Sequence, residues 1–151
     1  MENKKELIEN FLSLKIIAVA GASRNPKKFG HQVVKLFKDG GYTVYPVNPS
    51  GEQIAGTASF ADVSALPQDT EGLVIVTKPG VTDQVLDAAI ARGIKNIWIQ
   101  QMSETKAVLE KAAENQLKLV SKECVFMFVE PVKSIHKFHR FIKKLFRKYP
   151  C

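Results

Sequence analysis

Short apolar runs alternate with helix-forming stretches along most of the chain, and this alternation restricts the fold more than any other feature. Residues 16–20 (IIAVA) and 73–77 (LVIVT) are continuous apolar runs, which is typical of strands buried on both faces. Residues 29–38 carry apolar side chains at near-helical spacing, and Gly40 and Gly41 end that segment. Repeated units of this kind predict a Rossmann-like, doubly wound α/β fold with a mostly parallel sheet of about five strands and helices on both faces.

The same pattern gives approximate bounds for each element. Residues 50–69 are polar and turn-rich, and we expect a short strand, a loop and one helical turn there. Thr82 is the expected N-cap of the helix that follows the run at 73–77. The expected strands are residues 16–20, 42–47, 73–77, 96–99 and 118–120, and the expected helices are residues 5–14, 29–38, 81–91, 104–115 and 133–149.

Length and composition predict one domain over residues 1–151. A chain of 151 residues is long enough to bury its own core without disulfide bonds. No apolar run approaches the roughly 20 residues of a membrane span, and the first 15 residues lack the apolar core of a signal peptide. Cys124 and Cys151 do not make a disulfide framework, so we expect a reducing, cytoplasmic location.

The positive charge is concentrated at the end of the chain. Seven of the 22 basic residues and none of the 15 acidic ones lie in residues 131–151, so the net charge of +7 belongs to that segment. Residues 133–149 predict a basic amphipathic helix that docks its aromatic face on the domain. The alternatives are weak contact with an anionic surface and binding to an unidentified protein partner. We expect no specific recognition of nucleic acid.

Small and polar residues follow four of the expected strands. Because the carboxyl ends of parallel strands meet at one edge of a sheet, their loops should form one ligand crevice. The residues concerned are Gly21, Ala22 and Ser23, then Asn48 and Pro49, then Lys78, Pro79 and Gly80, and finally Gln100 and Gln101.

The loop after the first strand has the features of a phosphate site. Gly21 lets the backbone approach a ligand closely, and the amides at the start of the next helix attract an anion. Ser23 can donate a hydroxyl, and Arg24, Lys27 and Lys28 add positive charge. The alternative is a plain turn between a strand and a helix, in which glycine and serine serve only the turn geometry.

The loop differs from the usual dinucleotide fingerprint. Gly21 and Gly30 are present, but the closely spaced G-x-G-x-x-G trio is not. The second strand ends in YPVNP, without the carboxylate that normally binds the ribose hydroxyls of NAD. Asn48 can form a hydrogen bond to a ribose, so an NAD(P)-binding or redox-sensing domain remains an alternative.

Four motifs together resemble a known family. GASRNPKKFG, YPVNP, VTKP and WIQQ stand in the order found in bacterial CoA-binding domain proteins. These small single-domain proteins are similar to the N-terminal, CoA-binding domain of the succinyl-CoA synthetase alpha subunit. The resemblance covers roughly residues 14–125 and implies that the cofactor is coenzyme A or an acyl-CoA. The chain has Gln101 and Met102 where relatives often have Pro-Gly.

The resemblance also implies a role for particular residues. It places a first group of residues against the CoA diphosphate. A second group shapes the loop that holds the diphosphate, and a third group lines the adenosine side. A fourth group flanks the adenine or the start of the pantetheine arm, and a fifth closes the far wall. In that order the groups are Gly21, Ala22 and Ser23; Pro26, Lys28, Phe29 and Gly30; Val47, Asn48 and Pro49; Thr77, Lys78 and Pro79; and Gln100 and Gln101.

No catalytic arrangement stands out in the sequence. His31 is interpreted as a helix-surface residue, and Cys124 as a small buried hydrophobe, although it follows the last strand. His136 and His139 are three residues apart, but no further ligand is indicated, so we expect no metal site. The sequence therefore predicts a binding protein and not an enzyme. The alternatives are the NAD(P)-binding domain and an interaction module that acts through residues 133–149.

Overall fold

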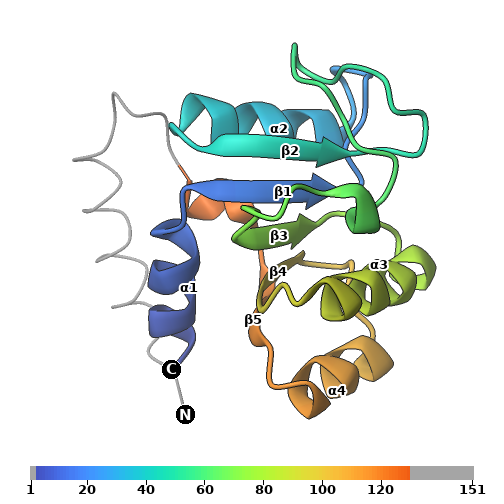
Figure 1. Ribbon diagram of the computed structural model, residues 1–151. Coiled ribbons are helices and arrows are strands. Elements are labelled where there is room, and N and C mark those ends of the chain that lie inside the picture. The colour runs from blue at the N-terminus through green and yellow to red at the C-terminus, as the bar shows by residue number, and fades with distance from the viewer. Residues whose placement is uncertain (1–2, 130–151) are drawn as a thin grey trace.

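The computed structural model describes residues 3–129, which form five strands and four α-helices (Figure 1). Strands and α-helices alternate except between the second and third strands, which only a loop with a 3₁₀ turn connects. The expected helix at 133–149 lies outside the described residues. The strands are β1 (Ile16–Ala20), β2 (Thr43–Val47), β3 (Gly72–Ile75), β4 (Asn96–Gln100) and β5 (Lys118–Glu123). The α-helices are α1 (Lys4–Leu12), α2 (Phe29–Asp39), α3 (Pro79–Arg92) and α4 (Lys106–Glu114), with short 3₁₀ turns η1 (Val63–Ala65) and η2 (Val125–Met127).

The five strands make one parallel sheet in the order β2-β1-β3-β4-β5. This confirms the predicted doubly wound α/β fold. After β1 the chain moves to one side of the sheet to form β2, and then crosses to the other side to form β3, β4 and β5. The order therefore reverses between β1 and β3, and ligands of such sheets bind at the carboxyl ends of the strands beside this reversal.

Side chains of the central strands point alternately into two apolar cores. From β1, Ile17 and Val19 enter the core beneath α1, α2 and η2, while Ala18 and Ala20 enter the core beneath α3 and α4. Because both faces of these strands are covered, the strands read as continuous apolar runs in the sequence. Trp98 of β4 anchors the first core: it is fully buried, and its ring lies edge-on to Phe11 with centroids 5.5 Å apart.

Three local predictions were wrong in detail. Residues 50–69 form no continuous strand, only isolated bridges and the turn η1. Helix α3 begins at Pro79, because proline fits the first helical position, where no amide hydrogen is needed. Thr82 is therefore not the N-cap: it is buried inside the helix, and its Oγ1 lies 2.8 Å from Thr77 Oγ1. Gln100 is the last residue of β4 and not part of the following loop.

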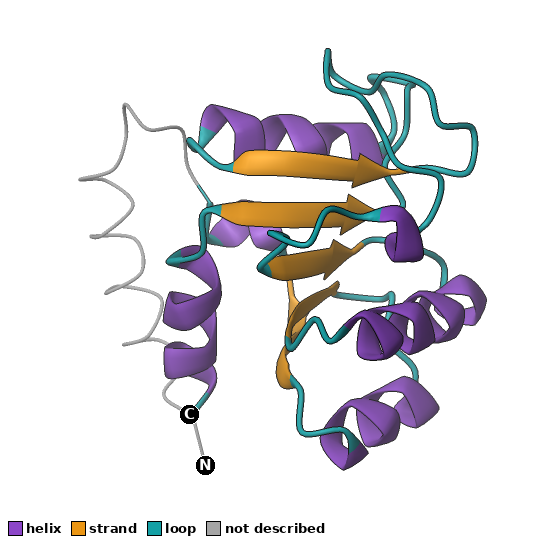
Figure 2. Ribbon diagram, in the orientation of Figure 1, coloured by secondary structure: helices purple, strands orange, loops and turns teal. Residues whose placement is uncertain are grey.

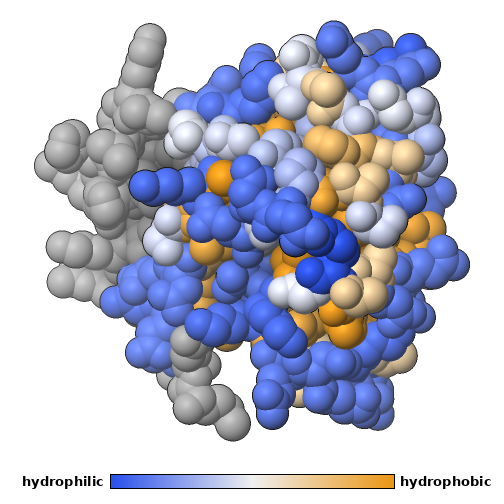
Figure 3. Space-filling view, in the orientation of Figure 1, coloured by the Kyte–Doolittle hydropathy of each residue, from blue (hydrophilic) through white to orange (hydrophobic). Residues whose placement is uncertain are grey.

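Loops gather at the carboxyl ends of the strands, and those after β1 and β2 project furthest (Figure 2). In the space-filling view this corner carries hydrophilic side chains at its rim, with weakly polar and apolar ones between them (Figure 3). Across residues 3–129, no helix has both the length and the apolar character needed to cross a membrane.

Candidate cofactor-binding site

Two glycines bring the start of α2 against the loop that follows β1. Gly21 has φ +92°, and a Cβ at this position would lie 2.9 Å from the Val76 side chain. A Cβ on Gly30, the second residue of α2, would lie 1.9 Å from the carbonyl oxygen of Gly21. Any larger residue at position 30 would push the helix away from the loop. The two glycines therefore fix the distance between the loop and the first amides of α2.

Hydrogen bonds within the loop hold residues 23–28 in one shape. The Asn25 amide donates to Ser23 Oγ at 3.2 Å, and the Lys27 amide donates to Asn25 Oδ1 at 3.0 Å. His31, predicted as a helix-surface residue, is half-buried, and its Nδ1 lies 2.9 Å from the Ser23 carbonyl oxygen. The His31 side chain thus connects α2 to the loop through the Ser23 carbonyl and leaves the Ser23 hydroxyl uninvolved in this contact.

Asn48 links the loop after β2 to the loop after β1. Its Nδ2 donates to the Ala22 carbonyl oxygen at 2.7 Å, and its Oδ1 accepts from the Ser50 amide at 2.8 Å. The second bond is an asparagine turn of the kind expected after the strand ends. Both ends of the Asn48 side chain are therefore used within the protein, and they set the spacing of the two loops.

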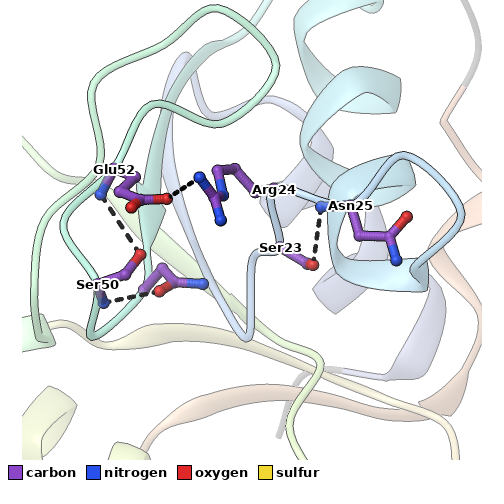
Figure 4. Close-up of a pocket in the computed structure, with 6 residues that line it drawn as sticks. Ser23, Arg24, Asn25, Ser50 and Glu52 are labelled. Atoms are coloured by element: carbon purple, nitrogen blue, oxygen red, sulfur yellow. Dashed lines mark hydrogen bonds and ion pairs between the residues drawn. The ribbon is translucent and has the colours of Figure 1, made fainter.

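A cavity of about 480 Å³ lies between these two loops. Arg24 and Glu52 point toward each other across it (Figure 4), with Arg24 Nη1 2.5 Å from Glu52 Oε2. No sequence motif marks Glu52, which stands in the turn-rich segment at 50–69 and shares no motif with Arg24. The cavity is lined by Ser23, Arg24, Asn25, Asn48, Ser50 and Glu52.

The two helices that begin beside the reversal of strand order have lysine as their N-cap. Neither Lys28 of α2 nor Lys78 of α3 makes a side-chain capping bond. A helix start has backbone amides without helical partners and the positive end of the helix dipole, so it attracts anions. Both lysines are exposed, and neither is ion-paired with a carboxylate of residues 3–129.

Helices α1 and α4 begin differently. The Asn3 side chain accepts from the Glu6 amide at 2.9 Å, and Glu6 Oε2 accepts from the Asn3 amide at 3.1 Å, which is a complete capping box. Thr105 Oγ1 accepts from the Val108 amide at 3.1 Å at the start of α4. The uncapped helix starts are therefore the two nearest the crossover from β1 to β3.

The remaining predicted site residues do not all face this cavity. Thr77 is half-buried in the loop between β3 and α3, and its hydroxyl bonds to that of Thr82. Gln100 is buried, and its Oε1 accepts from the Val125 amide at 3.0 Å, so its side chain reaches η2. Gln101 is exposed.

Pro26 and Phe29 lie toward the η2 side of α2. The Phe29 ring packs edge-on against Phe126 with centroids 5.3 Å apart. Pro26 lines a second hollow of about 400 Å³ together with His31 and Phe126. These two residues thus lie on the η2 side of the loop and do not line the cavity that holds Arg24 and Glu52.

The other candidates from the sequence stay apart from this cavity. Cys124 is half-buried between β5 and η2. No three His, Cys, Asp or Glu side chains within residues 3–129 come together as metal ligands. His136 and His139 lie outside the described residues.

Comparison with known proteins identifies the family of this fold and loop. Residues 15–130 match the family model described as a CoA binding domain. The chain belongs to the CoA binding domain family. This confirms the resemblance drawn from GASRNPKKFG, YPVNP, VTKP and WIQQ.

Members of the CoA binding domain family occur in proteins of different length. The chain is 28% identical over 130 residues to the acetate–CoA ligase [ADP-forming] II subunit alpha of Pyrococcus furiosus, covering 79% of this chain but 28% of that subunit. It is 25% identical over 129 residues to the uncharacterized protein YneT of Bacillus subtilis, covering 82% and 91% of the two chains. A solved conserved hypothetical protein from Pyrococcus furiosus is 31% identical with a TM-score of 0.71, covering 74% of this chain and 97% of that one.

Proposed function

We propose that this chain binds coenzyme A or an acyl-CoA, without turnover, at the carboxyl ends of β1, β2 and β3. The observation that carries the proposal is the pair of helix starts beside the crossover, where Lys28 and Lys78 replace the usual capping side chains. Each start combines the positive end of a helix dipole with an ammonium charge, and both attract a phosphate group. Membership of the CoA binding domain family supports CoA as the source of that phosphate.

The charge of CoA suits this edge of the sheet. CoA carries a diphosphate and a ribose 3′-phosphate, and basic side chains of both the β1 and the β3 loops lie here. No carboxylate directly follows β2, and the Glu52 carboxylate further along that loop is paired with Arg24. The Asn48 amide already bonds to Ala22 and Ser50. This arrangement favours CoA over NAD(P).

We propose for these residues the roles that the resemblance to CoA-binding domain proteins implies. Gly21, Ala22 and Ser23 meet the diphosphate together with Lys28 and the first amides of α2, whose approach Gly30 permits. Val47, Asn48 and Pro49 line the adenosine side, and Thr77, Lys78 and Pro79 flank the adenine or the start of the pantetheine arm. Pro26 and Phe29 shape the loop. The exposed Gln101 closes the far wall together with the backbone of Gln100, whose buried side chain bonds to the Val125 amide.

The proposal of binding without turnover rests on how the reactive side chains are used. His31 bonds to the Ser23 carbonyl, and the hydroxyls of Thr77 and Thr82 bond to each other. Acetate–CoA ligase is the activity named for the longer relative, of which this chain spans 28%. We therefore propose the cofactor-binding step alone for this chain. A role for residues 133–149 in binding an anionic surface or a protein remains a prediction.

Calorimetric titration of the purified chain with CoA, dephospho-CoA and NAD at two salt concentrations tests the proposal. We expect CoA to bind, dephospho-CoA to bind more weakly, and both affinities to fall at high salt and in Lys28→Ala. Binding of NAD without CoA would overturn the proposal in favour of a dinucleotide site. Binding of none of the three would remove the cofactor role from this crevice.

A further inference from the structure

The ion pair between Arg24 and Glu52 joins the two loops on either side of the cavity. We propose that this ion pair closes the cavity reversibly. The Glu52 carboxylate binds Arg24 until a phosphate group of the cofactor replaces the carboxylate as the partner of Arg24. This inference rests on the proposed function, because it concerns how the same cavity admits its ligand.

The geometry places a protein carboxylate where an anionic ligand would be held. Arg24 belongs to the loop after β1, and Glu52 to the loop after β2, so their side chains meet only across the cavity (Figure 4). Arg24 Nη1 and Glu52 Oε2 are 2.5 Å apart, although the two side chains are 70% and 46% exposed. The guanidinium of Arg24 is thus already paired with a carboxylate of the protein.

The backbone that carries the pair is fixed, so exchange requires only side-chain rotation. Asn48 ties the two loops together through Ala22 and Ser50. The backbone of Glu52 is held by Ser59, whose hydroxyl donates to the Glu52 carbonyl oxygen. Long, exposed side chains on such fixed loops change rotamer far faster than the loops change shape.

A phosphate is a stronger partner for Arg24 than Glu52 is. An exposed ion pair contributes little free energy, so the paired state of Arg24 and Glu52 is favoured over the open state by roughly fivefold at most. A guanidinium binds a phosphate through two parallel hydrogen bonds, and a phosphate monoester carries more charge than a carboxylate. A cofactor phosphate near Arg24 therefore displaces Glu52, whereas an uncharged molecule in the cavity leaves the pair closed.

The exchange makes a specific prediction for a double-mutant cycle. Glu52→Gln frees Arg24 in advance, so we expect it to tighten CoA binding about twofold to fivefold. Arg24→Gln removes the receiving cation, so we expect it to weaken CoA binding about fivefold to tenfold. In Arg24→Gln/Glu52→Gln the second substitution should change the affinity less than twofold, because no cation is left to release.

The matched control is Glu9→Gln. Glu9 Oε1 lies 3.8 Å from Lys5 Nζ on α1, and the Glu9 side chain is 50% exposed. The variant therefore removes the same charge from another exposed ion pair, outside the cavity. Its CoA affinity should equal that of the unchanged chain. Titrations at one salt concentration with CoA and dephospho-CoA identify the exchanging group. A loss in Arg24→Gln that appears only with CoA assigns the ribose 3′-phosphate, and a loss with both assigns the diphosphate.

The outcomes separate this inference from the proposed function. If the unchanged chain and Glu52→Gln both fail to bind CoA, the proposed function fails and the exchange fails with it. If CoA binds the unchanged chain and Glu52→Gln equally well, the exchange alone is overturned. If Glu52→Gln tightens binding by the same factor with and without Arg24, Glu52 acts by its electric field and the exchange is again overturned.

Discussion

The four helices of residues 3–129 fall into two pairs that begin in different ways. Helices α1 and α4 start with Asn3 and Thr105, whose side chains accept hydrogen bonds from first-turn amides. Helices α2 and α3 start with Lys28 and Lys78, which cannot accept such a bond. A cation at the N-terminus of a helix also opposes the helix dipole, at a cost of about 0.3–1 kcal/mol.

Under the proposed function, this difference separates helix starts that contribute to stability from helix starts that hold the ligand. The capped starts of α1 and α4 satisfy their own amides, as expected of helices that only cover the sheet. The uncapped starts of α2 and α3 lie where the strand order reverses, and a bound anion would supply both the missing acceptor and the missing negative charge. Substitutions at the two kinds of helix start should therefore change different quantities.

The largest effect is expected from Gly30→Ala. The new Cβ would lie 1.9 Å from the Gly21 carbonyl oxygen, so α2 or the loop must move. We expect a loss of about 1–3 kcal/mol in the free energy of unfolding and the loss of CoA binding. Chemical denaturation and calorimetric titration measure the two quantities.

Gly80→Ala is the matched control, because Gly80 is the second residue of α3 as Gly30 is of α2. A Cβ at Gly80 meets nothing within 4 Å. We expect the variant to gain up to about 1 kcal/mol in stability and to keep its affinity for CoA. Full CoA affinity in a folded Gly30→Ala variant would show that the close approach of α2 to the loop is not needed for binding.

The next largest effect is expected from Lys28→Asp, which gives α2 the kind of cap that α1 has. Lys28 already has the extended backbone of an N-cap, with φ −82° and ψ 145°. We expect the unliganded protein to gain about 0.5–2 kcal/mol, while CoA affinity falls about tenfold to a hundredfold because the carboxylate occupies the anion site. Thermal unfolding measures the gain in stability, and calorimetric titration of the same sample measures the loss of CoA affinity.

Lys27→Asp is the control for charge alone, since Lys27 precedes the cap position. It should reduce CoA affinity less than Lys28→Asp and should not stabilise α2. A Lys28→Asp variant that is more stable and still binds CoA normally would mean that the first amides of α2 do not hold the ligand.

Most of the fold was predictable because the central strands are buried on both faces. The side chains of β1 enter two cores, so no position of this strand is polar. Few folds other than a parallel sheet covered on both faces bury a continuous apolar strand that is followed by a helix. The bounds were less predictable where two signals compete. Thr82 is a good capping residue by type, but Pro79 fits the first helical position, and Thr82 Oγ1 instead bonds to Thr77.

The candidate site was predictable in its glycines and not in its cross-loop contacts. Gly21 and Gly30 follow from the motif after β1, and their close approach gives that motif a physical reason. The bond from Asn48 to Ala22 depends on the register that pairs Ala20 with Val47, which the sequence does not specify. The meeting of Arg24 with Glu52 depends in addition on the rotamers of two long side chains.

A smaller effect, on stability alone, is expected from Thr105→Ala. Thr105 Oγ1 accepts from the Val108 amide at the start of α4, and alanine removes that acceptor. We expect a loss of about 1 kcal/mol in the free energy of unfolding and an unchanged affinity for CoA. Chemical denaturation measures the free energy of unfolding, and calorimetric titration measures the affinity for CoA. A clear loss of CoA affinity would place α4 within the binding site and would end the division between the two pairs of helices.

The smallest effect at neutral pH is expected from Tyr42→Phe, beside the carboxyl end of α1. The Tyr42 hydroxyl donates to the Leu12 carbonyl oxygen at 2.6 Å, and burial raises the pKa of Tyr42 to about 12. At pH 7 the variant should lose about 0.5–1.5 kcal/mol, the usual contribution of one hydrogen bond, and should bind CoA normally.

The pH dependence tests the cause of this raised pKa. An unfolded tyrosine ionises near pH 10, and the folded one near pH 12, so the folded state keeps its proton longer. The stabilisation by Tyr42 is therefore fully present below pH 10 and is lost between pH 10 and pH 12. Lysines also ionise in this range, so the quantity to measure is the difference in unfolding free energy between the unchanged chain and Tyr42→Phe. A difference that stays constant from pH 9 to pH 12 would show that the hydroxyl is not buried against α1.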